Sequence, residues 1–142
     1  MIRPARQTDA TAVAAILSDY TDGTEWLPRV HSRAQDISHA AELIARGPMY
    51  VASETNVQGF IAWDGPRVQA LYVAEAARGR GVGKALLDRV KQRHGWLTLW
   101  TLEANEGARR FYAREGFAVL ARGTGNDEGL PEVQLLWERD KR

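Results

Sequence analysis

The feature that most constrains this chain is the stretch from Leu71 to Leu87, whose pattern predicts a strand, a glycine-rich turn and a helix. Gly79, Gly81 and Gly83 remove three side chains within five positions, so the backbone can take positive φ angles and approach a ligand closely. We expect the helix to begin at about Gly83. A turn that leads into a helix presents unpaired N–H groups, and the helix dipole favours an anion there. The stretch therefore predicts a site for a phosphate or pyrophosphate.

The charge around this turn points the same way. Residues 78–93 carry six Lys or Arg and one acidic residue, a local net charge of +5 in a chain whose net charge is only +1. The basic side chains nearest the turn are those of Arg78, Arg80 and Lys84, and they suit phosphate groups. For Arg80 and Lys84 a solvated surface explains the charge equally well.

Two familiar phosphate-binding motifs do not match. A Walker A loop needs one more residue between Gly79 and Gly83, and a hydroxyl where this chain has Ala85. The dinucleotide-binding fingerprint has Leu86 in place of its third glycine, and it follows the first strand of a domain. A nucleotide hydrolase and a dinucleotide-binding domain are therefore both disfavoured.

Hydrophobic periodicity and turn residues predict the elements on either side. Strands are expected at 1–6, 49–54, 57–63, 67–73, 96–102, 117–121 and 133–137. Helices are expected over 9–19, from Ser32 to the stop at Gly47-Pro48, from Gly83 to about His94, and from Asn105 to Gly116. Because the strand at 96–102 follows a strand and a helix, it should lie parallel to 67–73. The fold class is α/β of the α+β type, with a mixed, mostly antiparallel central sheet and flanking helices, in a single domain over 1–142.

Side chains that can cap helices mark three of these starts. Thr8 or Asp9 is expected to cap the first helix, and Asn105 the fourth. Ser32 and Gln35 have the spacing of a capping box.

A second motif follows the strand at 96–102. It reads Asn105-x-x-Ala108-x-x-Phe111-Tyr112-x-x-x-Gly116-Phe117. Together with Arg78-x-x-Gly81-x-Gly83, it resembles the acetyl-CoA-binding region of the GNAT superfamily of N-acetyltransferases. The motifs cover residues 68–117, and the order of elements agrees over about 1–138. Glu75 departs from the pattern, because many members have proline there.

The resemblance implies a GNAT fold in which two parallel strands splay apart and the pantetheine of acetyl-CoA lies between them, without a metal. The main chain around Leu71 and Val73 would bind pantetheine and the acetyl group, although plain core packing fits these residues as well. Backbone amides from Arg80 to Lys84 would hold the pyrophosphate. The implied cofactor-binding residues are Leu71, Tyr72, Val73, Arg78, Gly79, Arg80, Gly81, Val82, Gly83, Lys84, Asn105, Ala108 and Tyr112.

Tyr112 is the implied catalytic residue, because it matches the family tyrosine that protonates the departing CoA thiolate. The alternative is a core tyrosine whose hydroxyl has a hydrogen-bond partner. Direct attack of an amine on the thioester is expected, since the chain has no cysteine and no serine motif that would suggest an acyl-enzyme.

The acceptor amine must arrive uncharged, so a base or a water chain is needed. Glu25 and His31 in the irregular segment 20–31 are candidates, as are Asp127 and Glu128, and a solvated loop charge is the alternative for each. Trp26 forms an apolar cluster with Leu27 and Pro28, the two residues that follow it. It could line an acceptor pocket or pack the loop onto the core.

Composition narrows the remaining function classes. The chain has 142 residues, no cysteine and three histidines without metal-ligand spacing. No apolar run approaches the length of a membrane span, and near-neutral charge gives no support to nucleic-acid binding. We therefore expect a soluble cytoplasmic protein that acts on neither membranes nor nucleic acid; whether it forms a homodimer is left open.

We expect an N-acetyltransferase that transfers acetyl from acetyl-CoA to a primary amine. A small-molecule acceptor is favoured, because Trp26 and the loop at 123–131 could enclose a pocket. A protein N-terminal or lysine acetyltransferase is one alternative. A non-catalytic acyl-CoA-binding or sensing module is the other, and it would not need the Tyr112 hydroxyl.

Overall fold

The computed structural model describes residues 1–126 and 128–139. Its strands are β1 (Ile2–Pro4), β2 (Met49–Ser53), β3 (Val57–Asp64), β4 (Arg67–Val73), β5 (Trp96–Leu102), β6 (Ala118–Gly123) and β7 (Glu132–Glu138). Its helices are α1 (Ala10–Asp22), α2 (Arg33–Arg46), α3 (Val82–Lys91) and α4 (Glu106–Arg114). Two short 3-10 turns, η1 (Gln7–Asp9) and η2 (Glu75–Ala77), precede α1 and the glycine-rich turn.

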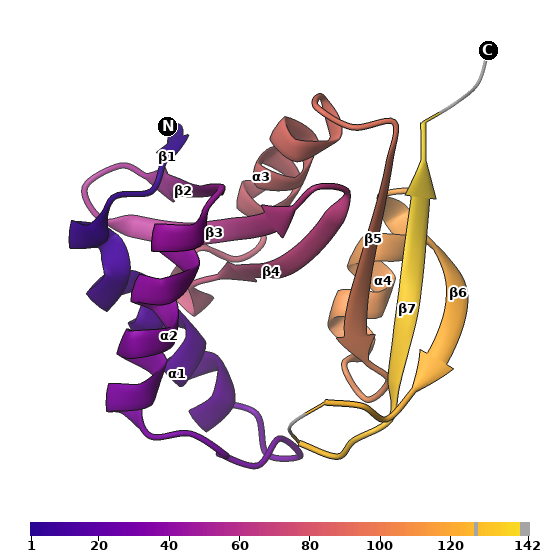
Figure 1. The fold of residues 1–142 in the computed structure, drawn as a ribbon, viewed down its shortest axis with the longest axis horizontal. Coiled ribbons are helices and arrows are strands. Elements are labelled where there is room, and N and C mark those ends of the chain that lie inside the picture. Colours follow the sequence, from indigo (N-terminus) through magenta and orange to yellow (C-terminus); the bar gives the residue numbers. More distant parts are fainter. Residues whose placement is uncertain (127, 140–142) are drawn as a thin grey trace.

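The strands form a seven-stranded sheet in the order β1-β2-β3-β4-β5-β7-β6. All neighbours are antiparallel except β4 and β5, so the expected mixed, mostly antiparallel sheet is confirmed. The parallel pairing of β4 with β5 is confined to Arg67 and Thr98, at the start of β4. Beyond that pair the two strands diverge (Figure 1). The diverging ends leave one edge of β4 without a neighbouring strand.

The helices cover both faces of the sheet. Successive side chains of a strand point to opposite faces, so neighbouring strand residues belong to different cores. In β3, Phe60 belongs to the core under α1 and α2, whereas Ile61 belongs to the core under α3. That second core continues beneath α4, where Tyr112 and Phe117 pack with residues of β5 and β7. Helices α3 and α4 therefore share one apolar core, and α1 and α2 share the other.

Local capping explains two of the helix starts. Ser32 Oγ accepts from Gln35 N (3.1 Å) while Ser32 N donates to Gln35 Oε1 (2.7 Å), so the predicted capping box is confirmed. Asn105 Oδ1 accepts from Ala108 N (3.1 Å), which confirms the predicted cap of α4.

The expected cap of α1 by Thr8 or Asp9 is wrong. Asp9 precedes α1, but its carboxylate accepts from Arg3 Nη1 and Nη2 (2.8 and 3.0 Å) and from Arg6 N (2.8 Å) instead. The carboxylate makes two parallel charge-assisted bonds to the guanidinium of Arg3 in β1, whereas a helix cap would supply one bond from a single backbone N–H. Helix α1 also continues to Asp22, which brings Tyr20 into its last turn.

Candidate active site

A cavity of about 580 Å³ lies between the end of β4, the start of α3 and helix α4. Of the residues predicted to bind the cofactor, all but Arg80 line it. Arg80 is exposed on the turn and faces neither this cavity nor the one described below. Residues that the prediction did not include, Tyr20, Ala77, Gly107, Phe111, Arg114 and Glu115, complete the lining. We call this space the cofactor cavity.

The three glycines of the turn form a cradle at its end. Gly79 and Gly81 have φ angles of 77° and 81°, which favour glycine, and Gly81 is the N-cap of α3. Gly83 is helical, and a Cβ there would lie 3.5 Å from side-chain atoms of Val73 and Phe111. The first helical bond runs from Ala85 N to Gly81 O (3.0 Å), and no described side chain caps the helix. The N–H groups before Ala85 are therefore directed at the cavity end, where an anion is favoured.

The edge of β4 that faces β5 offers main-chain groups to the same cavity. Ala74 N donates to Gln58 O of the neighbouring strand (2.8 Å). Hydrogen-bonded and non-bonded pairs alternate along antiparallel strands, so the main-chain groups of Leu71 and Val73 point away from β3. Arg78 Nε donates to Val73 O (3.1 Å). The other edge groups are placed to bind an extended ligand.

The basic side chains around the cradle differ in whether they form ion pairs within the protein. Lys84 Nζ lies 3.2 Å from Glu115 Oε1 and 3.4 Å from Asp88 Oδ2, and these partners raise the pKa of Lys84. Arg78 and Arg114 line the cavity, and Arg114 has no ion pair with any described residue. Arg78 has the bond to Val73 O but no ion pair with a described residue, so both guanidinium groups keep N–H donors that could meet phosphate.

Tyr112 lies deep in the cofactor cavity. It is 7% exposed, and its ring packs edge-on between Phe111 and Phe117, with ring centroids 5.2 and 5.3 Å away. Its hydroxyl has no hydrogen-bond partner among the residues the structure describes, and none of their buried polar side-chain atoms is unpaired. The hydroxyl therefore reaches the cavity. Burial raises the pKa of Tyr112 well above its usual range, so the phenol keeps its proton.

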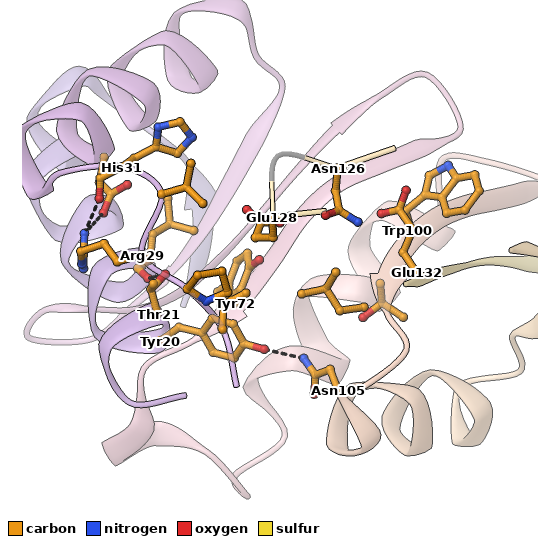
Figure 2. A pocket seen from close by; sticks show the side chains of 17 residues that line it. Tyr20, Thr21, Arg29, His31, Tyr72, Trp100, Asn105, Asn126, Glu128 and Glu132 are labelled. Atoms are coloured by element: carbon orange, nitrogen blue, oxygen red, sulfur yellow. Dashed lines mark hydrogen bonds and ion pairs between the residues drawn. The ribbon is translucent and has the colours of Figure 1, made fainter. Parts of the chain in front are cut away.

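A second cavity of about 250 Å³ lies on the α1 side of β4. It is bounded by the end of α1, the loop before α2, Trp100 of β5 and the β6–β7 loop (Figure 2). We call it the acceptor cavity. Among the described residues, Tyr20, Tyr72 and Asn105 line both cavities, so the two spaces meet at these three side chains.

Some of the residues predicted to bind the acceptor line this cavity, and others do not. His31 and Glu128 line it (Figure 2). Glu25 and Trp26 are exposed and line neither this cavity nor the cofactor cavity, so the structure does not bring them to the site. The loop turns at this point through a bond from Leu27 N to Thr24 O (3.1 Å), and Leu27 and Pro28 face the cavity instead. Asp127 lies outside the described residues.

The acidic groups of the acceptor cavity differ in whether they are neutralised. Asp36 forms an ion pair with Arg29 Nη1 (3.2 Å) and accepts a hydrogen bond from Ser18 Oγ (2.5 Å). Glu128 and Glu132 have no ion pair with any residue in the described part of the chain. Burial raises the pKa of Tyr72 to about 12, with Tyr20 and Glu128 nearby. The cavity therefore presents two unpaired carboxylates beside neutral phenols.

Sequence reasoning missed Tyr20, Trp100 and Glu132. The sequence pattern predicts an irregular segment that begins at Tyr20. However, Tyr20 lies one helical turn after Ile16, and an aromatic residue there continues the apolar face of α1. Trp100 and Glu132 lie on paired strands, and only the register of β5 with β7 brings them to one cavity.

No group of three or more His, Cys, Asp or Glu residues in ranges 1–126 and 128–139 could hold a metal ion. Within the same ranges, no helix has the length and apolar character that a bilayer crossing requires.

A glycine cradle at a helix start, a free strand edge and a phenol without a partner among the described residues lie in one cavity, an arrangement that suits an extended ligand with phosphate groups. The family model described as an acetyltransferase (GNAT) domain matches residues 45–119, and the chain therefore belongs to the GNAT acetyltransferases. It is an acetyl-CoA-dependent N-acyltransferase.

Two relatives from Escherichia coli K12 are named peptidyl-lysine N-acetyltransferases. YjaB is 29% identical over 132 residues, which cover 92% of this chain and 90% of YjaB. YiaC is 35% identical over 80 residues, so that match spans about half of each protein, 56% of this chain and 55% of YiaC.

Solved structures agree with the fold. Apo YjaB from Escherichia coli superimposes with a TM-score of 0.82 at 26% identity, covering 99% of this chain and 98% of that one. The structure of yncA from Salmonella typhimurium with its cofactor acetyl-CoA has a TM-score of 0.73 at 21% identity, with coverage of 100% and 95%. Both structures therefore share the fold of this chain, and that of yncA contains acetyl-CoA.

Proposed function

We propose that this chain transfers the acetyl group of acetyl-CoA to the side-chain amine of a lysine in a peptide or protein. The observation that carries the proposal is the acceptor cavity. Glu128 and Glu132, which have no ion pair with any described residue, line this space, and it opens onto the cofactor cavity. A lysine side chain matches this space, because its ammonium group suits carboxylates and its methylene groups suit Leu27 and Trp100. The names of YjaB and YiaC support this acceptor class.

A small-molecule amine is the second candidate. The sequence favours this acceptor because Trp26 and the loop at 123–131 could enclose a pocket. Trp26 lies outside the cavity, which weakens that argument.

The residues present fit acetyl-CoA, which would supply the acetyl group as a thioester. The N–H groups of Val82, Gly83 and Lys84 would hold the pyrophosphate, since the helix start has free donors there. The main-chain edge at Leu71 and Val73 would hold the pantetheine. The lack of a side chain at Gly83 supports the fit, because a Cβ would fill space beside Val73 and Phe111.

Tyr112 would act as the proton donor of the reaction and Glu128 as the proton acceptor. An ammonium acceptor loses two protons in all, one before its nitrogen attacks the acetyl carbon and one as the amide forms. The carbon–sulfur bond breaks to give a thiolate that takes up one proton, so one proton is released overall. Tyr112 keeps its proton through burial and has no competing partner in the described residues, which suits a donor to the thiolate. Glu128 lines the acceptor cavity and would accept the proton that the incoming ammonium loses, directly or through water. The proton lost as the amide forms would return to the Tyr112 oxygen through water.

An acceptor panel tests the proposal. Three acceptors are compared with acetyl-CoA: a peptide with one internal lysine and a blocked N-terminus, the same peptide with a free N-terminus and a blocked lysine, and a short diamine. Released thiol gives the rate, and mass spectrometry gives the modified amine. We expect the internal-lysine peptide to have the highest kcat/KM. A preference for the diamine would favour the second candidate, and CoA binding without transfer to any amine would favour a sensing module.

A further inference from the structure

The boundary between the two cavities is formed by a hydrogen bond across the gap between β4 and β5. Asn105 Nδ2 donates to the Tyr20 hydroxyl at 2.6 Å, and the two residues are 85 positions apart in sequence (Figure 2). Tyr20 comes from α1 and Asn105 from the start of α4. Both belong to the small group of described residues that line the two cavities together.

Both members of this pair are held from other directions as well. Asn105 Oδ1 accepts from Ala108 N (3.1 Å), so its side-chain amide is fixed at both ends. The Tyr20 ring packs edge-on against Tyr72 with centroids 5.2 Å apart, and Tyr20 O accepts from Thr24 Oγ1 (2.6 Å). Moving the Tyr20 ring would therefore break a hydrogen bond and an aromatic contact together.

Tyr20 and Asn105 lie where the acyl group of the donor would meet the acceptor amine. An amine in the acceptor cavity can reach a thioester in the cofactor cavity only where the two spaces meet. If the thioester sulfur lies beside Tyr112 and the carbonyl beside the β4 edge, the free end of the acyl group faces Tyr20 and Asn105. A methyl group needs little room there, whereas each further methylene extends toward the Tyr20 ring.

We infer that Tyr20, held by Asn105, is a specificity-determining residue that restricts the acyl donor to acetyl and disfavours longer acyl chains. This inference rests on the proposed function, because that function places the thioester at the junction. A longer chain would have to displace the ring and lose both of its contacts. The two losses together predict that the Kd of butyryl-CoA exceeds that of acetyl-CoA by about tenfold.

Calorimetric titration tests this without an acceptor. CoA, acetyl-CoA and butyryl-CoA are titrated into the wild-type protein, Tyr20→Ala, Tyr20→Phe and Tyr50→Ala. Tyr50 packs against Trp63 and lines neither cavity, so Tyr50→Ala is the matched control for loss of a tyrosine. We expect the tenfold preference for acetyl-CoA in the wild type and the control. Tyr20→Ala should bind the two thioesters within about threefold of each other, and Tyr20→Phe should lie between, since it keeps the ring but not the hydrogen bond.

Equal affinities of the wild type for acetyl-CoA and butyryl-CoA would overturn the inference. An unchanged ratio in both Tyr20 variants would overturn it too, and Tyr20→Phe decides the matter if Tyr20→Ala does not fold. A wild-type protein that binds no CoA at all would instead overturn the proposed function and this inference with it.

Discussion

The glycines of the cofactor cradle differ in what the missing side chain provides. Gly79 and Gly81 are needed for their positive φ angles, and a Cβ at either would meet no atom within 4 Å. Gly83 has an ordinary helical conformation, and its absent side chain leaves space next to Val73 and Phe111. Substitution at Gly83 should therefore affect ligand binding more than backbone strain.

Gly83→Val is predicted to abolish CoA binding while the protein stays folded. Its Cβ would already be in contact with Val73 and Phe111, and two further methyl groups would occupy the space beside the cradle. Calorimetry with CoA measures the loss, and thermal unfolding checks the fold. Gly95→Val is the control, because Gly95 is exposed and far from any neighbour that its Cβ would meet. Unchanged CoA affinity in folded Gly83→Val would place the pyrophosphate elsewhere.

At the level of elements, local signals predicted most of the fold. The capping box at Ser32 and the glycine turn act through neighbouring residues, so the sequence alone locates α2 and α3 well. Long-range contacts decided the rest. Asp9 pairs with Arg3 of β1, and Tyr20 pairs with Asn105 across the gap, and neither pairing has a local signal. Trp26 was an apolar residue in the right loop, but the turn at Leu27 directs it outward.

The pair of Arg3 and Asp9 joins β1 to the start of α1 and should make stability depend on pH. The hydrogen bond from Arg3 holds the pKa of Asp9 below its ordinary value of 3.8. A group whose pKa is lower in the folded state stabilises the protein at pH values above its unfolded-state pKa. This stabilisation is lost as the pH falls through the folded-state pKa. Asp9→Asn should lower the Tm at pH 7, and the difference from wild type should shrink below about pH 4. Thermal unfolding between pH 7 and pH 2 measures it.

Asp64→Asn, at an exposed aspartate, is the control for that series. A difference between wild type and Asp9→Asn that stays constant from pH 7 to pH 2 would contradict the account of this ion pair.

For the whole molecule, the order of the strands decides how the two substrates meet. Strands β4 and β5 pair only at their beginning, so the cofactor cavity lies between β4 with α3 on one side and α4 on the other. A ligand that contacts both sides should hold them together. The proposed cofactor is therefore expected to stabilise the fold as well as supply the acetyl group.

CoA is predicted to raise the Tm with increasing concentration and without added metal. At 100 times its Kd, a ligand that binds only the folded state stabilises it by about 2.7 kcal/mol. At roughly 3 °C per kcal/mol for a chain of this size, the shift should be about 8 °C. Differential scanning fluorimetry with and without EDTA measures it. A shift that disappears in EDTA, or no shift at saturating CoA, would contradict the cofactor assignment.

The most direct test of the central claim is the turnover of Tyr112→Phe with acetyl-CoA and an internal-lysine peptide. The variant keeps the ring between Phe111 and Phe117 and removes only the hydroxyl, which has no partner among the described residues. We predict that kcat falls by about 10²–10⁴-fold, the usual contribution of a general acid, while CoA affinity and Tm change little. A folded Tyr112→Phe protein that turns over at the wild-type rate would contradict the claim that this hydroxyl protonates the leaving thiolate.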